Sequence, residues 1–378
     1  MNNKNKNILK NPGFQSFLSA IICIIIGVVI GYLVLLAISP ENASEGIVAI
    51  LKNFLNYNKK KSVYKYLGST LVKTAPLVMC SLSILFAYKV GFFNIGAAGQ
   101  YVAGAAASLF CALYFNMNWV LCLIVSIIAG AVWGAIPGLL KAYRNVNEVI
   151  SGIMLNWIGL YIANSLIMVV KDPKTPFSYK IDEVNPSAVL PSFGLDQLFS
   201  KNRYVTIAVP LAVIVAIVIW VILEKTKLGY ELKATGANKH AAIYCGMNEK
   251  KNTVLTLAIS GGLAGLGACF NYLSGVEQWA TTQTSVPGMG FNGIASAFLG
   301  GLSPIGAIFS SFFIQHITLG GGYLDKRVYC AQVSDLMSAI IIYLCGFAFF
   351  FKIILNRAID KSEEKKALKA KEEKGGEK

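Results

Sequence analysis

The feature that most constrains this chain is a series of long apolar runs that are almost free of charge. The first run, residues 17–38, holds no charged residue and is as long as a helix that crosses a bilayer. Fifty-five per cent of the chain is hydrophobic and 14% is charged, where a soluble domain has about 25% charged residues. A soluble core cannot hide that much apolar surface. The sequence therefore predicts an all-α, polytopic integral membrane protein.

Further apolar runs follow the first. They lie near 66–90, 97–115, 119–141, 148–170, 204–223, 252–274, 291–303, 304–319 and 334–351. The first run is too long for the apolar part of a signal peptide and precedes no small-residue cleavage site, so we expect an anchor helix. About ten membrane elements are predicted, of which the run at 291–303 is short.

The distribution of Lys and Arg predicts the orientation. If the N-terminus is cytoplasmic, twenty-one of these residues lie inside and twelve outside, with Lys73 within a run. The three lysines at 59–61 are an exception on the outer side. We therefore expect a cytoplasmic N-terminus at 1–16, a membrane domain at 17–351 and a charged cytoplasmic tail at 352–378. The domain includes an external loop at 171–203 and a cytoplasmic loop at 224–251.

Missing motifs narrow the class of protein. No apolar run carries a carboxylate near its middle, which argues against an ion-coupled carrier. The two histidines form no HExxH motif and the eight cysteines form no CxxC pair, so no metal site and no catalytic group is expected. The dipeptide Gly-Lys never occurs, so the chain lacks a P-loop for ATP. The net charge of +15 lies in loops and tails, which favours contact with membrane lipid over nucleic acid.

The cytoplasmic loop contains the stretch LGYELKATGANKHAAIYCGM, residues 228–247. Residues 237–244 are predicted to form a short amphipathic helix, with Gly236 as a turn before it and Gly246 as a stop after it. Two interpretations remain open. The helix docks into a groove on a soluble partner, or it lies on the lipid headgroups.

Two glycine-interrupted segments occur in the two halves of the chain, at 90–105 and 287–311. Each contains Gly-Phe, an Asn and then small residues that lead into a new apolar run. Paired interruptions of this kind indicate a translocation path at the interface of two pseudo-repeated halves, because irregular backbone survives in a membrane only beside a cavity or inside protein. The alternative is that the glycines only permit close packing, and we favour the path.

Other polar and small residues have structural interpretations. Asn147 and Glu148 open an apolar run and are typical of an N-terminal helix cap. Glycines at four-residue spacing, at 130, 134, 138, 261 and 265, predict close helix packing. Lys73 lies inside a run, where a lysine is either functional or reaches the surface by its long stem, and we favour the second.

The chain resembles the permease subunits of bacterial ABC importers for branched-chain amino acids, ribose and nucleosides. The resemblance covers residues 70–350 and rests on GFFNIGAAGQYVAG, NEVISGIMLNWI, LGYELKATGANKHAAIYCGM and GFNGIASAFLGG. It is greatest to the longer of the two permeases in nucleoside importers of the guanosine type. The family motif usually reads NIG-x-Glu-Gly-Gln, and Ala98 stands here in place of the acidic residue.

This resemblance implies a plasma-membrane permease that is not an enzyme and binds no cofactor, because a separate ATPase subunit binds ATP. It also implies a second, shorter permease in a heterodimer and an extracellular lipoprotein that delivers the nucleoside. Within 228–247 it implies a coupling helix that inserts into the ATPase, and the residues expected to couple are Gly229, Ala234, Gly236, Asn238, Ala241, Ala242 and Gly246.

Neutral, polyhydroxylated cargo suits amide side chains, which both donate and accept hydrogen bonds. The residues expected along the translocation path are Asn94, Gln100, Asn156, Asn271, Glu277 and Gln278. Two alternatives remain. The same architecture serves importers of simple sugars or branched-chain amino acids, and a stand-alone channel or secondary carrier would need no partner at all.

Overall fold

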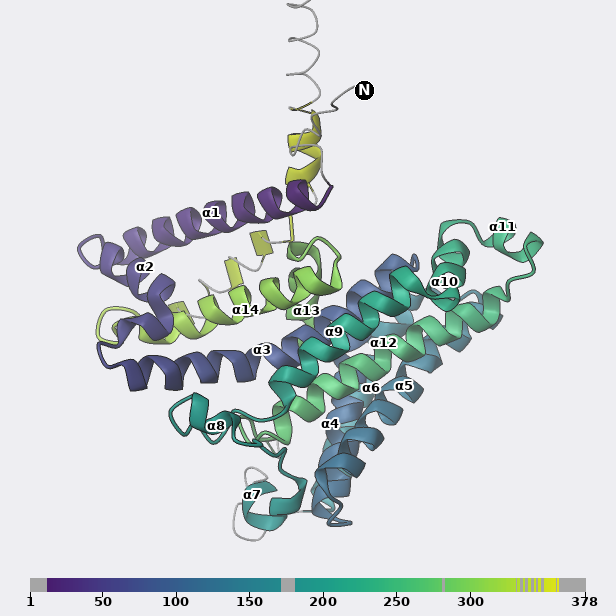
Figure 1. The fold of residues 1–378 in the computed structure, drawn as a ribbon, viewed down its shortest axis with the longest axis horizontal. Helices are drawn as coiled ribbons and strands as arrows, with labels where there is room; N and C mark the ends of the chain where they lie inside the picture. Colours follow the sequence, from purple (N-terminus) through teal and green to yellow (C-terminus); the bar gives the residue numbers. More distant parts are fainter. Residues whose placement is uncertain are drawn as a thin grey trace, which may run out of the picture.

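The computed structural model describes residues 12–170, 181–280 and 283–330, together with scattered positions between 332 and 359. Within these ranges the chain is helical and forms no β-strand. Figure 1 shows long helices that lie side by side, with α10 and α11 at one end of the molecule and α7 and α8 toward the other. The predicted all-α architecture is therefore confirmed for the described part of the chain.

The helices occur in the following order. The first half contains α1 (Pro12–Ile38), α2 (Ala43–Lys52), α3 (Lys60–Lys89), α4 (Ala97–Leu113), α5 (Trp119–Arg144) and α6 (Glu148–Met168). Two short helices follow, α7 (Ile181–Val184) and α8 (Leu195–Leu198). The second half contains α9 (Ala208–Lys225), α10 (Lys227–Ala237), α11 (Lys239–Tyr244), α12 (Glu249–Tyr272), α13 (Met289–Leu299) and α14 (Pro304–Gly320).

Six of the described helices are long and apolar enough to cross a membrane: α1, α3, α5, α6, α9 and α12. The run predicted near 291–303 corresponds to α13, whose 11 residues rise about 16 Å, roughly half of a hydrocarbon core. The last predicted run, 334–351, lies largely outside the described residues. The structure thus describes a multi-pass membrane protein, and the count of ten elements stays a prediction.

Helices α3 and α12 form the centre of the molecule. In their most apolar stretches 89% of α3 and 78% of α12 is buried by the rest of the protein, against 22% for α1 and for α5. The exposed side chains of α5 include Ile124, Ile128 and Val132. An apolar face of this kind suits lipid contact, whereas the two central helices are surrounded by protein.

Glycines bring α5 and α12 into backbone contact. A Cβ added to Gly130 would lie 2.3 Å from the carbonyl oxygen of Gly261, and one added to Gly265 would lie 2.4 Å from that of Ser126. Ser126 Oγ also donates a hydrogen bond to the Gly265 carbonyl oxygen (2.6 Å). Small residues allow this approach. The predicted packing role of these glycines is confirmed.

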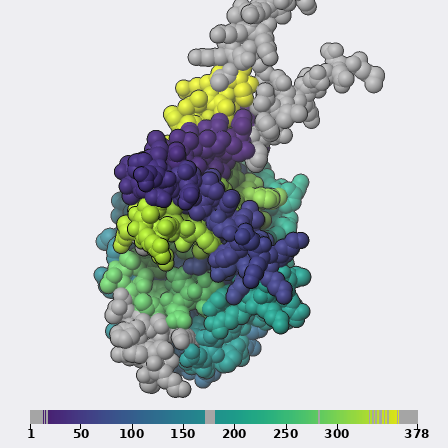
Figure 2. Space-filling view, turned by 90° about the vertical axis from the view of Figure 1, so that its left-hand side faces the viewer, coloured from purple at the N-terminus to yellow at the C-terminus, as the bar shows by residue number. Residues whose placement is uncertain are grey.

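The N-terminal helices cover α14. Figure 2 shows the purple segment at α1 and α2 lying against the yellow-green α14. Asn53, which follows α2, donates hydrogen bonds to the His316 carbonyl oxygen (3.0 Å) and to Thr70 Oγ1 (3.4 Å). The start of the chain is therefore tied to both α3 and α14.

The start of α6 is as the sequence predicts. Asn147 Oδ1 accepts a hydrogen bond from the Val149 amide (2.8 Å), which confirms the N-terminal cap. Glu148 Oε2 lies 3.0 Å from Lys141 Nζ near the end of α5. A carboxylate in the first turn is also favourable for the helix dipole. These contacts fix the turn between α5 and α6.

Candidate functional site

The first glycine-interrupted segment is a break between α3 and α4. Helix α3 ends at Lys89, Gly91 has a φ of +89°, and α4 begins at Ala97. Asn156 of α6 holds this break: its Oδ1 accepts from the Gly99 amide (2.7 Å) and its Nδ2 donates to the Ile95 carbonyl oxygen (3.1 Å). One amide side chain thus serves two backbone groups that the interruption leaves without helical partners.

A second amide network lies inside the same break. Asn94 Nδ2 donates to Gln100 Oε1 (2.8 Å), and Gln100 Nε2 donates back to Asn94 Oδ1 (3.1 Å). Asn94 Nδ2 also lies within hydrogen-bond distance of Ser260 Oγ on α12 (2.6 Å). Ser260 in turn donates to the carbonyl oxygen of Ser83 on α3 (2.7 Å). The network joins the break to both central helices.

The second interruption lies between α13 and α14, where Gly301 has a φ of +65°. The two interrupted segments meet in space. A Cβ on Gly290, at the start of α13, would lie 2.6 Å from the Cα of Ala98 at the start of α4. Small residues at both positions therefore allow the two segments to touch. Whether the two halves are repeats of one another stays a prediction.

Three of the predicted path residues are buried in this region: Asn94, Gln100 and Asn156 are 4%, 1% and 2% exposed. Their amide groups already bond to protein, so they hold the shape of the break. Contact between these three side chains and cargo stays a prediction.

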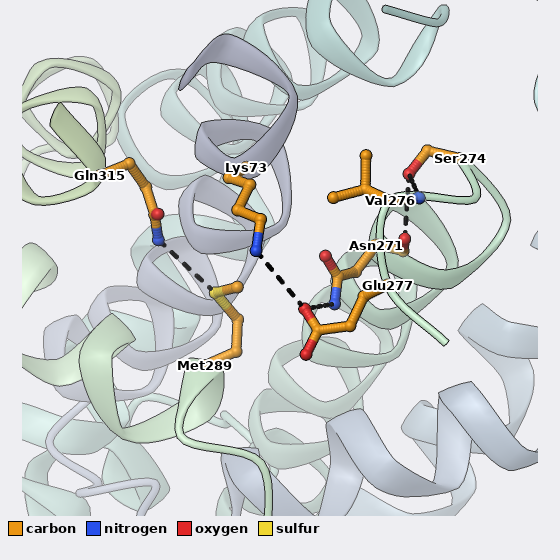
Figure 3. A network of polar contacts seen from close by, with 7 residues as sticks. All are labelled: Lys73, Asn271, Ser274, Val276, Glu277, Met289 and Gln315. Carbon is orange, nitrogen blue, oxygen red and sulfur yellow. Dashed lines mark hydrogen bonds and ion pairs between the residues drawn. The ribbon is translucent and has the colours of Figure 1, made fainter. Parts of the chain in front are cut away.

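The other three predicted path residues border a cavity of about 220 Å³ at the C-terminal end of α12. Its walls are Tyr101, Asn271, Tyr272, Glu277, Gln278, Gln283, Ser285, Val286, Pro287, Gly288 and Met289. Asn271 Nδ2 donates a hydrogen bond to Glu277 Oε2 (3.0 Å), as Figure 3 shows. The structure thus brings Asn271, Glu277 and Gln278 together at this cavity. The three predicted residues of the first half lie elsewhere, in the break between α3 and α4.

Lys73 of α3 approaches the same carboxylate. Its Nζ lies 4.0 Å from Glu277 Oε2, and the two side chains are 35% and 47% exposed (Figure 3). The sequence favours a lysine whose long stem reaches the surface. The structure instead places it near an acidic residue, Glu277, on a loop that is distant in the sequence. Partly exposed pairs at this distance contribute at most about 1 kcal/mol. The lysine therefore balances the charge of Glu277 without locking it in place.

The loop that carries Glu277 is anchored to α6. Trp279 is buried, and its indole Nε1 donates to Asn164 Oδ1 (3.0 Å). Asn164 Nδ2 donates to the Gln283 carbonyl oxygen (2.8 Å). Trp279, Tyr101 and Tyr272 are not among the residues predicted from the sequence. The signal for Trp279 is the run Glu-Gln-Trp, which lies shortly after the apolar run at 252–274.

At the opposite end of α12 lie the two helices of the predicted coupling loop. Asn238 caps α11, since its Oδ1 accepts from the Ala241 amide (3.1 Å), and Gly246 follows α11 with a φ of +79°. The short helix is therefore Lys239–Tyr244 rather than 237–244. The interpretation of Gly236 as a turn is wrong, because Gly236 lies within the last turn of α10.

Gly236 is instead a contact point with the first half of the chain. A Cβ there would lie 1.7 Å from the Val90 carbonyl oxygen and 2.3 Å from its carbon. Val90 directly follows α3, so α10 rests on the first residue of the break. On its other side α10 is bonded to α12, because Asn252 Nδ2 donates to Thr235 Oγ1 (2.8 Å). Gly229 allows the close turn from α9, with its added Cβ 2.1 Å from the Ile222 carbonyl oxygen.

The surface formed by α10 and α11 exposes large apolar side chains beside charged ones such as Lys227 and Lys239. Tyr230, Ile243 and Tyr244 are 66%, 50% and 94% exposed, while Ala242 beside them is buried. Figure 1 shows α11 at the tip of the molecule, where no other labelled helix lies on its outer side. Ala234 accepts from the Asn238 amide (3.0 Å), which links the two helices. The described residues include no cluster of His, Cys, Asp and Glu that could hold a metal ion.

A multi-pass fold with a polar cavity is typical of a membrane transport protein of the permease class. The family described as the permease component of branched-chain amino acid transport systems matches residues 66–346. The chain belongs to this family.

Several characterised proteins are similar to the chain. The guanosine ABC transporter permease protein NupP of Bacillus subtilis is 31% identical over 89% of this chain and 95% of its own length. The nucleoside ABC transporter permease protein NupB of Lactococcus lactis is 31% identical over 98% of both chains. The guanosine ABC transporter permease protein NupQ of Bacillus subtilis is 27% identical over 75% of this chain and 90% of its own length. No solved structure showed significant similarity.

Proposed function

We propose that the chain is the nucleoside-transporting permease subunit of an ATP-driven importer in a bacterial plasma membrane, with both termini cytoplasmic. Similarity to two permeases named for nucleosides or guanosine, each over most of both chains, supports this cargo. A neutral cargo fits a cavity lined by the amides Asn271, Gln278 and Gln283. A simple sugar or a branched-chain amino acid is the alternative cargo, and competition by ribose or leucine for uptake would reveal it.

The single observation that carries the coupling mechanism is the contact between Gly236 and Val90. An ATPase subunit that binds the exposed face of α11 moves α10, and α10 rests on the first residue of the interrupted segment. Movement at the ATPase therefore reaches the break through the backbone contacts of Gly236 with Val90 and Gly91. ATP is bound by that separate subunit, and no cofactor is assigned to this chain.

Two further partners complete the proposed complex. Bacillus subtilis has both NupP and NupQ, two guanosine permeases similar to this chain, which supports a heterodimer with a second, shorter permease. An extracellular lipoprotein delivers the nucleoside to the outer face. On the orientation expected from the Lys and Arg distribution, that face includes the cavity at the C-terminal end of α12.

The docking of α11 is tested by Ala241→Asp. Ala241 is exposed on α11, and a carboxylate there puts a charge beside the exposed apolar side chains of Ile243 and Tyr244. We expect radiolabelled guanosine uptake to fall at least about tenfold, with unchanged amounts of the protein in the membrane. The matched control is Gln197→Asp, which adds the same charge to the exposed surface of α8. Normal uptake by the Ala241 variant would refute the docking assignment.

A further inference from the structure

The cavity at the end of α12 combines groups that recognise planar and hydroxylated molecules. Two aromatic rings border it, those of Tyr101 and Tyr272, with centroids 6.1 Å apart. Amides and one carboxylate, Glu277, supply the polar part of the wall. Apolar faces with a few placed polar groups are typical of small-molecule sites.

The Tyr101 side chain is the most unusual member of this wall. The residue is 0% exposed, and its hydroxyl has no partner at good hydrogen-bond geometry among the described residues, with the Asn271 side chain as a polar neighbour. A buried hydroxyl without a partner costs free energy, and most such groups are satisfied. The hydroxyl is closed off from solvent, so a ligand meets it only after a neighbouring side chain of the wall moves.

Glu277 has acceptor capacity left over. Its Oε2 accepts from Asn271 and lies 4.0 Å from Lys73, which leaves lone pairs on both oxygens for further donors. The side chain is half-exposed at the edge of the cavity, and Trp279 anchors its loop to α6. An anchored carboxylate is suited to a ligand that presents two adjacent donors.

We propose that this cavity is a nucleoside-recognition site in the permease itself, in which Glu277 accepts two adjacent donors of the nucleoside and the Tyr101 hydroxyl pairs with a further polar group. The inference rests on the proposed function and goes beyond it, because it makes the permease discriminate among nucleosides after the binding protein has released them. Two donor pairs meet the requirement: the ribose 2′- and 3′-hydroxyls, and the N1–H and 2-amino edge of guanine.

The test is Glu277→Gln, which keeps the shape of the side chain and removes its charge. Uptake is measured in cells that express the complete transporter, with radiolabelled guanosine, 2′-deoxyguanosine or inosine at saturating concentration. The binding protein is then full, so a remaining difference among the nucleosides arises in the permease. We expect guanosine uptake to fall about tenfold or more.

The two analogues distinguish the two donor pairs. If Glu277 binds the ribose, the variant loses only the preference for guanosine over 2′-deoxyguanosine. If Glu277 binds the guanine edge, the variant loses only the preference for guanosine over inosine. Asp182→Asn is the matched control, because Asp182 borders the adjacent cavity of about 130 Å³ but not this one. Wild-type uptake of all three nucleosides by the Glu277 variant would overturn the proposal.

A second variant, Tyr101→Phe, separates recognition from folding. Removing a buried hydroxyl that makes no hydrogen bond of good geometry should leave the melting temperature about unchanged or raised. We expect guanosine uptake to fall about fivefold at the same time, while Tyr114→Phe, at an exposed position after α4, stays at wild type. Full uptake by Tyr101→Phe would show that the hydroxyl takes no part in nucleoside recognition. If the wild-type complex carries no nucleoside at all, the proposed function fails, which is a different result.

Discussion

Gly236→Ala tests the contact between the coupling helices and the first break. The added Cβ would lie 1.7 Å from the Val90 carbonyl oxygen, and real Cβ contacts essentially never fall under 3.0 Å. Helix α10 therefore has to move by about 1.3 Å, since the obstacle is backbone and cannot rotate away. Overpacking of this kind costs about 1–3 kcal/mol, and each 1.4 kcal/mol changes the equilibrium constant for docking of α10 about tenfold.

The assay measures guanosine uptake and ATP hydrolysis by the same purified complex in liposomes, with the lipoprotein present. We expect uptake to fall about tenfold while ATP hydrolysis continues, because α11 still binds the ATPase but no longer moves the break. Gly322→Ala is the control, since a Cβ there meets nothing within 4 Å. Gly236→Ala with normal uptake and normal abundance would refute the mechanical link.

Two predictions concern stability. Asn156→Leu leaves the Gly99 amide and the Ile95 carbonyl oxygen without their partner, so we expect a loss of about 2–4 kcal/mol, seen as a lower melting temperature of the purified protein. Gly130→Ala places a Cβ 2.3 Å from the Gly261 carbonyl oxygen. It should separate α5 from α12 and reduce the folded yield in detergent, and a yield equal to wild type would contradict the packing described above.

Hydrophobic pattern and helix caps could be read directly from the sequence. Within the described residues the apolar runs correspond to helices, because a helix satisfies its own backbone hydrogen bonds inside a membrane. Asn147 caps α6, as its place at the start of an apolar run predicts. The four-residue glycine spacing likewise predicted close packing, because it places small residues on one helix face, where they let a second backbone approach. These features are local in sequence and need no knowledge of partners in space.

The tertiary partners of polar residues could not be predicted. Lys73 and Glu277 are far apart in the chain, and only the arrangement of α3 and α12 brings them near one another. Gly236 looked like a turn because glycine often ends helices, yet the Val90 backbone is what requires it. Grouping Asn94 with Asn271 rested on residue type alone, which cannot distinguish an amide bonded inside a break from one that borders a cavity.

Helix α12 extends for 24 residues, about 36 Å, and has a different task at each end. Asn252 near its start bonds to α10, and Asn271 near its end borders the polar cavity. Thermodynamic linkage then makes the two ends reciprocal: if closure of the ATPase weakens nucleoside binding by some factor, nucleoside in the cavity disfavours closure by the same factor. Binding of nucleoside in the cavity would thereby influence closure of the ATPase through α12.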